Sequence, residues 1–522
     1  MATATSRSMP IFLLGVILII GIYFRFTNLE DKVYWHDETY TSLRISGFTS
    51  QEMIQQVFKG QIVDFEKLQQ YQSLNPDKNL ADVLNSLAVD DPQHPPLYYL
   101  LLRLWVHFWG SSVTVIRSLS ALISLLIFPA VYWFCYELFL MPQVGLMAMG
   151  LMAISPVHLV YAQEAREYIL WGVAVLLTNA ALLRAIREKT RLSWVLYALT
   201  LAMSFYSFIL TGLVALGHAV YVLFTEKFQL SRTLIPYLIA SLLAFMAFLP
   251  WVLVLVNNYA RFQVSTAWTG SIQVPWQTLL QAWVLHVVRI FFDFDLDFSH
   301  PLNLISFPLV LSLVGYSIYA LTQQTPNSVW LFIVIWLAAT SLPLMLPDLI
   351  SGGVRSASHR YLIPSFLAIQ VSVAYLLATH LFNGKYFYQK RWKMLTAVLI
   401  SVGIASCSVN SHAETWWNKL LSYNLPTVAQ IINGTDNPLV VSHSSNTNLG
   451  NILSLSYLVS PSVKFQLVAD SKIPIIPPGF KNVFLLNPSE AMKFDLERQL
   501  DTKANFVFGD DYIQVLSLLN SK

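Results

Sequence analysis

The sequence predicts a polytopic α-helical membrane protein that ends in a small soluble α/β domain. Of its 522 residues, 55% are hydrophobic and only 12% are charged, and the mean hydropathy is +0.54. A soluble globule has too little interior for so much apolar surface, so lipid has to be the solvent for most of the chain. Long apolar runs fill residues 1–410, whereas 411–522 show the mixed, proline-broken pattern of a soluble domain.

Eleven apolar runs are long enough to cross about 30 Å of hydrocarbon as helices. They cover residues 9–25, 117–135, 143–161, 168–186, 193–209, 210–226, 233–256, 304–322, 328–346, 361–381 and 394–410. We therefore expect about eleven spans, with an upper count of thirteen. The first run lacks a small-residue cleavage site, which indicates a retained anchor rather than a removed signal peptide.

The basic residues predict the orientation of these spans. They concentrate in three connections, which carry Arg184, Arg187, Lys189 and Arg191, then Lys227 and Arg232, then Lys385, Lys390, Arg391 and Lys393. The positive-inside rule makes these connections cytoplasmic. With eleven spans and a cytoplasmic N-terminus, the first loop and the tail then lie on the extracytoplasmic side of the cell membrane.

A twelfth apolar run, residues 95–109, would reverse the side of the first loop if it crossed the membrane. This run is short, opens with Pro95-Pro96 and carries Arg103 and His107. We interpret it as an amphipathic helix lying on the outer membrane surface. The first outer loop, 26–116, is thus expected to contain surface helices.

The expected domains are a membrane module, residues 1–410, and a soluble extracytoplasmic domain, residues 411–522. Short apolar runs in the tail are typical of strands that alternate with helices such as 416–432. These runs cover residues 439–441, 463–468, 483–486 and 512–519.

Several function classes are disfavoured by what the sequence lacks. The net charge of +3 is dispersed and forms no basic stripe, so nucleic acid is not an expected partner. Cys135 and Cys407 both lie in apolar runs, where cysteine acts as a small core residue. We find no phosphate-cradling glycine loop, zinc-ligand spacing or serine-nucleophile elbow, which disfavours nucleotide-driven pumps and hydrolases of those types.

Two adjacent carboxylates follow the first predicted span. Asp37 and Glu38 stand in the sequence YWHDETY, residues 34–40, beside His36. Acidic groups held near a membrane are costly to desolvate unless they serve a purpose. The alternative is a solvated loop, or a helix start whose dipole favours the two acids.

A second motif, DDPQHPPLYY at residues 90–99, opens the predicted surface helix. Two prolines at the first helical positions place His94 at a helix N-terminus, where free backbone N–H groups suit an anion such as phosphate. Ordinary helix-start chemistry with a surface histidine is the alternative.

Two further motifs lie in predicted outer connections. YAQEAREY, residues 161–168, carries Glu164 and Arg166 in a turn close to the membrane, and SHRYLIP, residues 358–364, carries Arg360 at the outer start of a span. An arginine there could hold a lipid phosphate bidentately. The alternatives are an interfacial ion pair in the first case and a snorkelling arginine in the second.

A run of aspartates could instead bind a hard cation. Asp293, Asp295 and Asp297 would share one face of an extended segment. Their spacing is generic, so we prefer a solvated outer loop.

The four motifs in this order resemble those of membrane glycosyltransferases with the GT-C fold. The pattern is Asp-Glu after the first span, then His-Pro-Pro-Leu, then Glu-Ala-Arg-x-Tyr, then Arg-Tyr-Leu-x-Pro. The group that it most resembles is family 39, which includes the protein O-mannosyltransferases and, more distantly, the aminoarabinose transferases that modify lipid A. The resemblance covers residues 1–410 and does not extend to the tail.

The resemblance implies an inverting transfer of a sugar, of the mannose or pentose type, from a polyprenyl-phosphate donor on the non-cytoplasmic face. The acceptor would be a hydroxyl of a protein, glycan or lipid. Asp37 would be the general base and Glu38 would position the base or the acceptor. The implied phosphate-binding residues are His94, Arg166 and Arg360, and the implied cavity-lining residues are Tyr98, Glu164, His359 and Tyr361. Some relatives carry a lysine at the position of His94, and this departure leaves the donor sugar open.

No cofactor is assigned, and dependence on a divalent metal is left open, because Gln93 and scattered histidines are too few to name ligands. The rival interpretation is a non-catalytic flippase or transporter of lipid-linked sugars. The predicted spans are nearly free of ionisable residues at mid-depth, where transporters usually carry them, which favours the enzyme.

Overall fold

The computed structural model describes residues 5–382, 386–445, 447–470 and 472–519. The chain forms two compact units. One, the membrane unit, contains Met1–Thr27, Asp91–Tyr98 and Arg117–His412; the other, the α/β unit, contains Asn28–Asp90, Tyr99–Ile116 and Ala413–Lys522. Most of the predicted first outer loop therefore belongs to the same unit as the tail.

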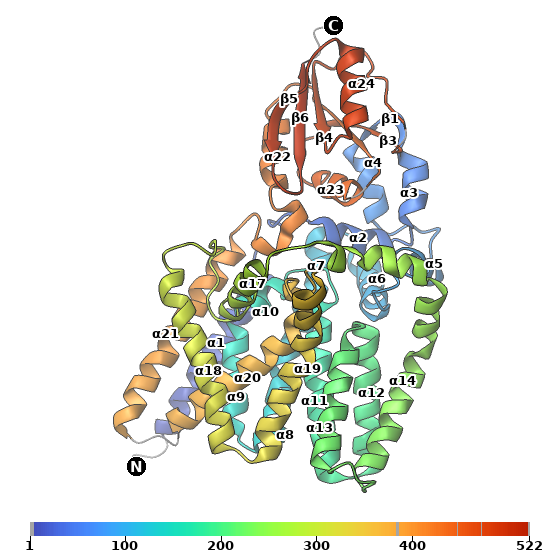
Figure 1. Ribbon diagram of the computed structural model, residues 1–522. Helices are drawn as coiled ribbons and strands as arrows, with labels where there is room; N and C mark the ends of the chain where they lie inside the picture. The colour runs from blue at the N-terminus through green and yellow to red at the C-terminus, as the bar shows by residue number, and fades with distance from the viewer. Residues whose placement is uncertain (1–4, 383–385, 446, 471, 520–522) are drawn as a thin grey trace. The chain divides into compact units, whose positions relative to one another are not determined.

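Helices of different lengths make up most of the membrane unit (Figure 1). They are α1 (Thr5–Phe26), α7 (Val113–Leu125), α8 (Ile127–Phe139), α9 (Pro142–Ala153), α10 (Pro156–Ala162), α11 (Tyr168–Glu188), α12 (Arg191–Ser207), α13 (Thr211–Thr225), α14 (Leu234–Asn257), α15 (Tyr259–Thr266), α16 (Trp268–Ser271), α17 (Trp276–Val288), α18 (Asn303–Gln324), α19 (Asn327–Ser351), η2 (His359–Leu362), α20 (Ile363–Phe382) and α21 (Tyr386–Ser411).

Among the described residues, seven helices are long and apolar enough to span a membrane, and a bent pair, α9 with α10, would make an eighth span. The seven are Val113–Phe139, Tyr168–Glu188, Leu234–Asn257, Asn303–Gln324, Asn327–Ser351, His359–Phe382 and Gln389–Ser411. Two shorter apolar helices, Ile11–Phe26 and Thr211–Thr225, coincide with further predicted spans. The chain is thus a polytopic helical membrane protein, while the count of eleven stays a prediction.

Two of these helices form the centre of the membrane unit. α20 and α11 are buried along most of their apolar stretches, whereas α14 and α19 are largely exposed. Exposed leucine and isoleucine side chains on α14 suit contact with lipid tails, which are as apolar as the side chains themselves. Polar side chains on the central helices, such as Asn179 on α11 and Gln370 on α20, are therefore buried away from lipid.

The chain bends by 63° between α9 and α10, at Pro156. Backbone groups released at such a break need partners when no water is present. The guanidinium of Arg25, on α1, donates to the carbonyls of Ala153 at 2.7 Å and Met152 at 2.9 Å, and it is fully buried. Arg25 therefore satisfies the C-terminal carbonyls of α9.

The α/β unit is built on a six-stranded sheet with the order β1-β3-β2-β4-β6-β5. Its strands are β1 (Lys59–Asp64), β2 (Leu439–His443), β3 (Lys464–Val468), β4 (Asn482–Leu486), β5 (Asn505–Gly509) and β6 (Gln514–Leu519). β2 is parallel to β3 and β4, and the other pairs are antiparallel. β2, β3, β4 and β6 coincide with the predicted strands.

β1 comes from the first outer loop and pairs with β3 of the tail. Lys464 donates from Nζ to Asp64 Oδ1 at 2.6 Å, and Gln466 donates from Nε2 to the Gly60 carbonyl at 2.9 Å. This strand covers an edge of the tail sheet that would otherwise be open for pairing. Residues about 400 positions apart in sequence thus share one sheet.

Helices cover both faces of the sheet (Figure 1). α24 (Glu490–Leu500) packs on the face that carries Leu439 and Val441, and α22 (Leu425–Asn433) and α23 (Asn448–Leu455) pack on the opposite face. Successive side chains of a strand point to opposite faces, and β2, β3 and β4 are buried almost throughout, so both faces of the sheet carry buried side chains.

Short helices of the outer loop complete the α/β unit. They are α2 (His36–Ile45), α3 (Ser50–Val57), α4 (Phe65–Gln69), η1 (Gln70–Gln72) and α5 (Leu80–Asp90), together with most of α6 (Leu97–Trp109). α6 lies where the surface helix was predicted. It buries Tyr99, Leu102 and Val106 on one side and exposes the apolar side chains of Phe108 and Trp109. Its position at a membrane surface stays a prediction.

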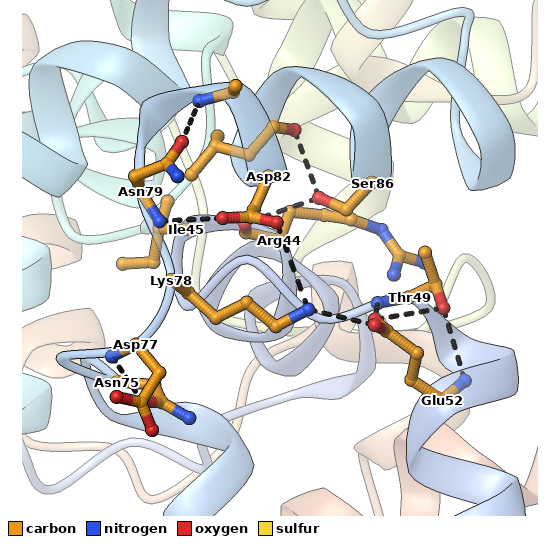
Figure 2. A network of polar contacts seen from close by, with 12 residues as sticks. Arg44, Ile45, Thr49, Glu52, Asn75, Asp77, Lys78, Asn79, Asp82 and Ser86 are labelled. Atoms are coloured by element: carbon orange, nitrogen blue, oxygen red, sulfur yellow. Dashed lines mark hydrogen bonds and ion pairs between the residues drawn. The ribbon is translucent and has the colours of Figure 1, made fainter.

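Polar contacts hold the outer loop in a defined shape. Figure 2 shows Lys78 between two carboxylates, with its Nζ 2.8 Å from Glu52 and 3.9 Å from Asp82. Glu52 also closes a capping box at the start of α3, because it accepts the Thr49 N–H at 2.7 Å while Thr49 Oγ1 accepts the Glu52 N–H at 3.1 Å. The C-terminal part of α2 is tied to α5 by an ion pair of 2.6 Å between Arg44 and Asp90.

Candidate active site

The turn 163–167, between α10 and α11, carries two of the predicted site residues and is almost completely buried. Gln163 donates from Nε2 to the Phe24 carbonyl at 2.8 Å, which ties the turn to α1. The Arg166 N–H donates to the Glu164 carbonyl at 2.8 Å. The backbone therefore holds Glu164 and Arg166 in one tight, anchored turn.

Three side chains form a hydrogen-bonded cluster around this turn. His94 Nδ1 lies 2.6 Å from Glu167 Oε1, and Arg166 Nη2 lies 3.2 Å from His94 Nε2. Arg166 is also 3.5 Å from Glu167. A guanidinium only donates, so Nε2 accepts, and the proton of the neutral imidazole sits on Nδ1 and is donated to Glu167.

The tautomer decides what this cluster can do chemically. With its Nε2 accepting from Arg166, His94 orients the guanidinium, and Arg166 is the member that can donate to an anion. Direct binding of phosphate by His94 stays a prediction. Burial raises the pKa of the Glu167 carboxyl, but the charge of Arg166 and the hydrogen bond from His94 outweigh it and lower that pKa to about 2. Glu167 is therefore a carboxylate at neutral pH.

The segment that carries His94 is held by contacts with two helices. Trp251, on α14, donates from Nε1 to the Pro92 carbonyl at 3.1 Å, and Ser265, on α15, donates to Gln93 Oε1 at 2.8 Å. The His94 N–H donates to the Asp91 carbonyl at 3.0 Å. Gln93, considered above for metal binding, thus has a structural contact.

Arg360 lies among three aromatic rings. Its guanidinium carbon is 5.8 Å from the centre of the Tyr168 ring, 5.9 Å from Trp268 and 5.7 Å from Tyr361. Arg166 lies 5.6 Å from the same Tyr168 ring. Aromatic faces hold a guanidinium without using its edges, and the edges are what bind phosphate bidentately. Two arginines thus share one tyrosine.

Phe208 is the apolar centre of this group. It ends α12 and lies 6.2 Å from the His94 ring, 5.6 Å from the Tyr168 ring and 5.9 Å from the Tyr361 ring. Phe208 therefore connects residues of three predicted motifs. Nothing in its sequence context, the end of a predicted span, distinguished it from a lipid-facing residue.

His359 and Tyr98 have other partners. Tyr161 OH and His359 Nδ1 are 2.9 Å apart, and the rings of His286 and His359 are 4.8 Å apart. Tyr98 is fully buried, and its hydroxyl lies 2.7 Å from Ser120 Oγ on α7. The cavity-lining roles of these residues stay predictions.

Asp37 and Glu38 belong to the α/β unit, where they occupy the first turn of α2. Asp37 is half-buried, whereas Glu38 is fully buried. Glu38 Oε2 accepts the Trp35 N–H at 3.4 Å and lies 3.8 Å from Lys419 Nζ. The helix start considered as an alternative for these two acids is present, and Glu38 takes part in it.

Within the membrane unit the structure brings together His94, Arg166 and Arg360 of the predicted site, and Glu164 lies in the same turn as Arg166. Glu167, which sequence reasoning passed over, contacts two of them. The sequence signal for Glu167 was its position beside Arg166 in the charged turn, but only Glu164 matched the glutamate of the motif.

Among the described residues no group of three or more His, Cys, Asp or Glu side chains could hold a metal ion. The aspartate run is not solvated throughout, because Asp293 is buried, 3.8 Å from Arg289.

Residues 93–253 match the family of dolichyl-phosphate-mannose-protein mannosyltransferases. This segment includes His94 and the turn with Arg166 and Glu167. Comparison with curated protein sequences finds no match. Solved structures are similar to this chain over a longer stretch than the family match covers. ArnT from Cupriavidus metallidurans bound to undecaprenyl phosphate superposes with a TM-score of 0.53 at 13% identity, over 100% of this chain and 99% of that one.

The chain has the GT-C fold of membrane glycosyltransferases. The apo form of the same ArnT gives a TM-score of 0.54 at 12% identity, over 98% of both chains. The archaeal oligosaccharyltransferase AglB from Archaeoglobus fulgidus, in complex with an inhibitory peptide and a dolichol-phosphate, gives 0.53 at 13% identity, over 92% of this chain and 70% of that one. The expectation of a GT-C fold with a small C-terminal sheet domain is confirmed.

Proposed function

We propose that this protein is an inverting glycosyltransferase that moves a sugar from a polyprenyl-phosphate donor to a hydroxyl acceptor on the extracytoplasmic face. The observation that carries the proposal is the cluster of Arg166 and Arg360 around Tyr168, in a chain with the GT-C fold. Two guanidiniums held by ring faces suit a phosphate that gains charge as it leaves. Glu167 and His94 would keep Arg166 pointed at that phosphate.

The proposed step is a single in-line displacement. Asp37 takes the proton of the acceptor hydroxyl, the acceptor oxygen forms a bond to the anomeric carbon, and the bond from that carbon to the phosphate oxygen breaks. The polyprenyl phosphate leaves with the electron pair of that bond, and its charge is stabilised by the arginines. One displacement inverts the anomeric centre. Because the lipid phosphate is a stable anion, no strong acid is needed.

Lipid-linked donors are supported by the solved relatives, whose structures were obtained with undecaprenyl phosphate and with a dolichol-phosphate. A mannose-type sugar is supported by the family match to residues 93–253. A pentose type is the second option, in line with the resemblance of the motifs to aminoarabinose transferases. The acceptor is a hydroxyl of a protein, glycan or lipid.

The decisive experiment replaces Asp37 with Asn in the purified, lipid-reconstituted protein. The amide is almost isosteric with the carboxylate but cannot accept the acceptor proton, so we expect transfer from a polyprenyl-phosphate sugar to fall by at least about a hundredfold. Binding of the polyprenyl phosphate, measured separately, should stay unchanged. Asp31→Asn is the matched control, because Asp31 is exposed and six positions away.

Near-normal transfer by Asp37→Asn would refute the base assignment. Movement of the lipid-linked sugar across a vesicle membrane, without transfer by the unmodified protein to any hydroxyl acceptor, would refute the enzyme and favour the transporter.

A further inference from the structure

The first turn of α2, which carries Asp37, does not cap itself fully. Trp35 is the N-cap residue, and its side chain accepts no capping hydrogen bond. The first N–H groups of a helix have no partner inside the helix, so another group has to accept from them. In α2 the acceptor for one of them, the His36 N–H, comes from the tail of the chain, within the same α/β unit.

The segment η3 (Trp417–Ser422) supplies contacts to three residues at the start of α2. Ser422 Oγ accepts the His36 N–H at 3.0 Å. Lys419 Nζ lies 3.8 Å from Glu38 Oε2 and 5.2 Å from the centre of the Trp35 ring. The side chains of Lys419 and Glu38 are 2% and 0% exposed, so this ion pair is desolvated.

A second tail element closes on the same turn from α23. Gly450 approaches His36 so closely that a Cβ added to it would collide with the imidazole ring. Thr39 Oγ1 lies 3.4 Å from the Gly450 carbonyl as well as 2.8 Å from the His36 carbonyl. The turn that carries Asp37 is thus held between η3 and α23.

We propose that η3 is a positioning element for sugar transfer, in which Lys419 and Ser422 set the direction of the Asp37 carboxylate through the first turn of α2. A buried ion pair is a poor source of stability, but it holds a specific geometry, because any other arrangement leaves a charge without its partner. A shift of a catalytic group by about 1 Å can cost about a hundredfold in rate. The inference rests on the proposed function, in which Asp37 is the base.

Two substitutions test the inference in the full-length, lipid-reconstituted protein. Ser422→Ala removes the acceptor for the His36 N–H without introducing a charge, and Lys419→Met removes the cation while keeping the chain length. Lys419→Arg is the conservative variant. The matched controls are Ser462→Ala and Lys481→Met, because both residues are exposed in the same unit.

Transfer kinetics and amide hydrogen exchange are both measured. For Ser422→Ala we expect kcat to fall about fivefold, as for the loss of one hydrogen bond, and for Lys419→Met about tenfold or more. KM for the lipid donor should stay unchanged, and Lys419→Arg should restore much of kcat. Exchange should accelerate in a peptide covering α2 and stay unchanged in one covering α24. The controls should match the unmodified protein in both measurements.

Unchanged exchange in α2 for both variants would overturn the inference, because η3 would then not hold the turn. Faster exchange with an unchanged kcat would also overturn it, because the turn would then not matter for transfer. Near-normal transfer by Asp37→Asn would show separately that the proposed function fails. That outcome does not change what the exchange measurement says about η3 and α2. Ser422→Ala keeps the test informative if Lys419→Met does not fold, since it leaves the buried ion pair in place.

Discussion

Glu167 shows how one buried carboxylate can organise a cationic site. It accepts from His94 and lies 3.5 Å from Arg166, so it holds both groups while neutralising only part of the positive charge around Tyr168. A fully buried carboxylate is costly unless its hydrogen bonds are satisfied. Here the partners are Arg166, which is proposed to bind the donor phosphate, and His94, which is proposed to orient Arg166, so the buried carboxylate serves the proposed site.

Replacing Glu167 with Gln should therefore weaken transfer without removing the base. We expect kcat/KM for the lipid donor to fall about tenfold, corresponding to one hydrogen bond to a charged group. The measurement is transfer at donor concentrations below KM, with Glu188→Gln as control, because Glu188 lies at the cytoplasmic end predicted for α11. Equal kinetics for the two variants would contradict the role of Glu167.

The same carboxylate also predicts a dependence of stability on pH. The folded-state pKa of Glu167 is lowered from 4.5 to about 2. A lowered pKa contributes stability above pH 4.5 that is lost as the pH falls towards 2. In thermal unfolding between pH 7 and 3, the unmodified protein should thus lose more stability than Glu167→Gln.

At the scale of elements, the break between α9 and α10 decides where the charged turn lies. An unbroken helix would carry Tyr161 and the turn after it along the direction of α9, whereas the 63° bend turns α10 away from it. Pro156 and Ser155 mark the break, and Ser155 donates from Oγ to the Ile290 carbonyl at 2.8 Å. Hydrogen bonds made inside the protein, those of Arg25 and Ser155 among them, stabilise the bend.

Arg25→Met tests this account. The substitution keeps much of the side-chain volume but leaves the carbonyls of Met152 and Ala153 without the guanidinium, at a cost of about 2 kcal/mol or more. We expect a lower unfolding temperature in detergent and a loss of transfer that follows the unfolded fraction. Arg232→Met is the control, at a predicted cytoplasmic connection. Unchanged stability of Arg25→Met would contradict the capping role.

At the scale of the whole molecule, the proposed orientation can be tested by labelling. Two variants with one added cysteine, Ser462→Cys and Arg191→Cys, place exposed thiols in the tail and in a predicted cytoplasmic connection. Cys135 and Cys407 are buried, so their background should be low. A membrane-impermeant maleimide should label Ser462→Cys from outside and Arg191→Cys only after the membrane is opened. The reverse pattern would place the site in the cytoplasm.

The site itself was only partly predictable. His94, Arg166 and Arg360 were predicted because each stands in a short motif that resembles those of known glycosyltransferases. Phe208 has no such motif, and its role comes only from the rings that meet it. The tautomer of His94 also depends on contacts between residues 72 and 73 positions apart, which no local pattern contains.

The sequence by itself determined the membrane class, most of the helices, four strands of the tail and the GT-C fold, because hydropathy runs, alternation and ordered motifs are properties of neighbouring residues. Only the tertiary structure decided that β1 of the outer loop completes the tail sheet and that η3 and α23 hold the turn carrying Asp37. Those contacts join segments about 400 residues apart. Strand pairing and burial of side chains stabilise these contacts, and the surfaces that pair exist only after the chain has folded.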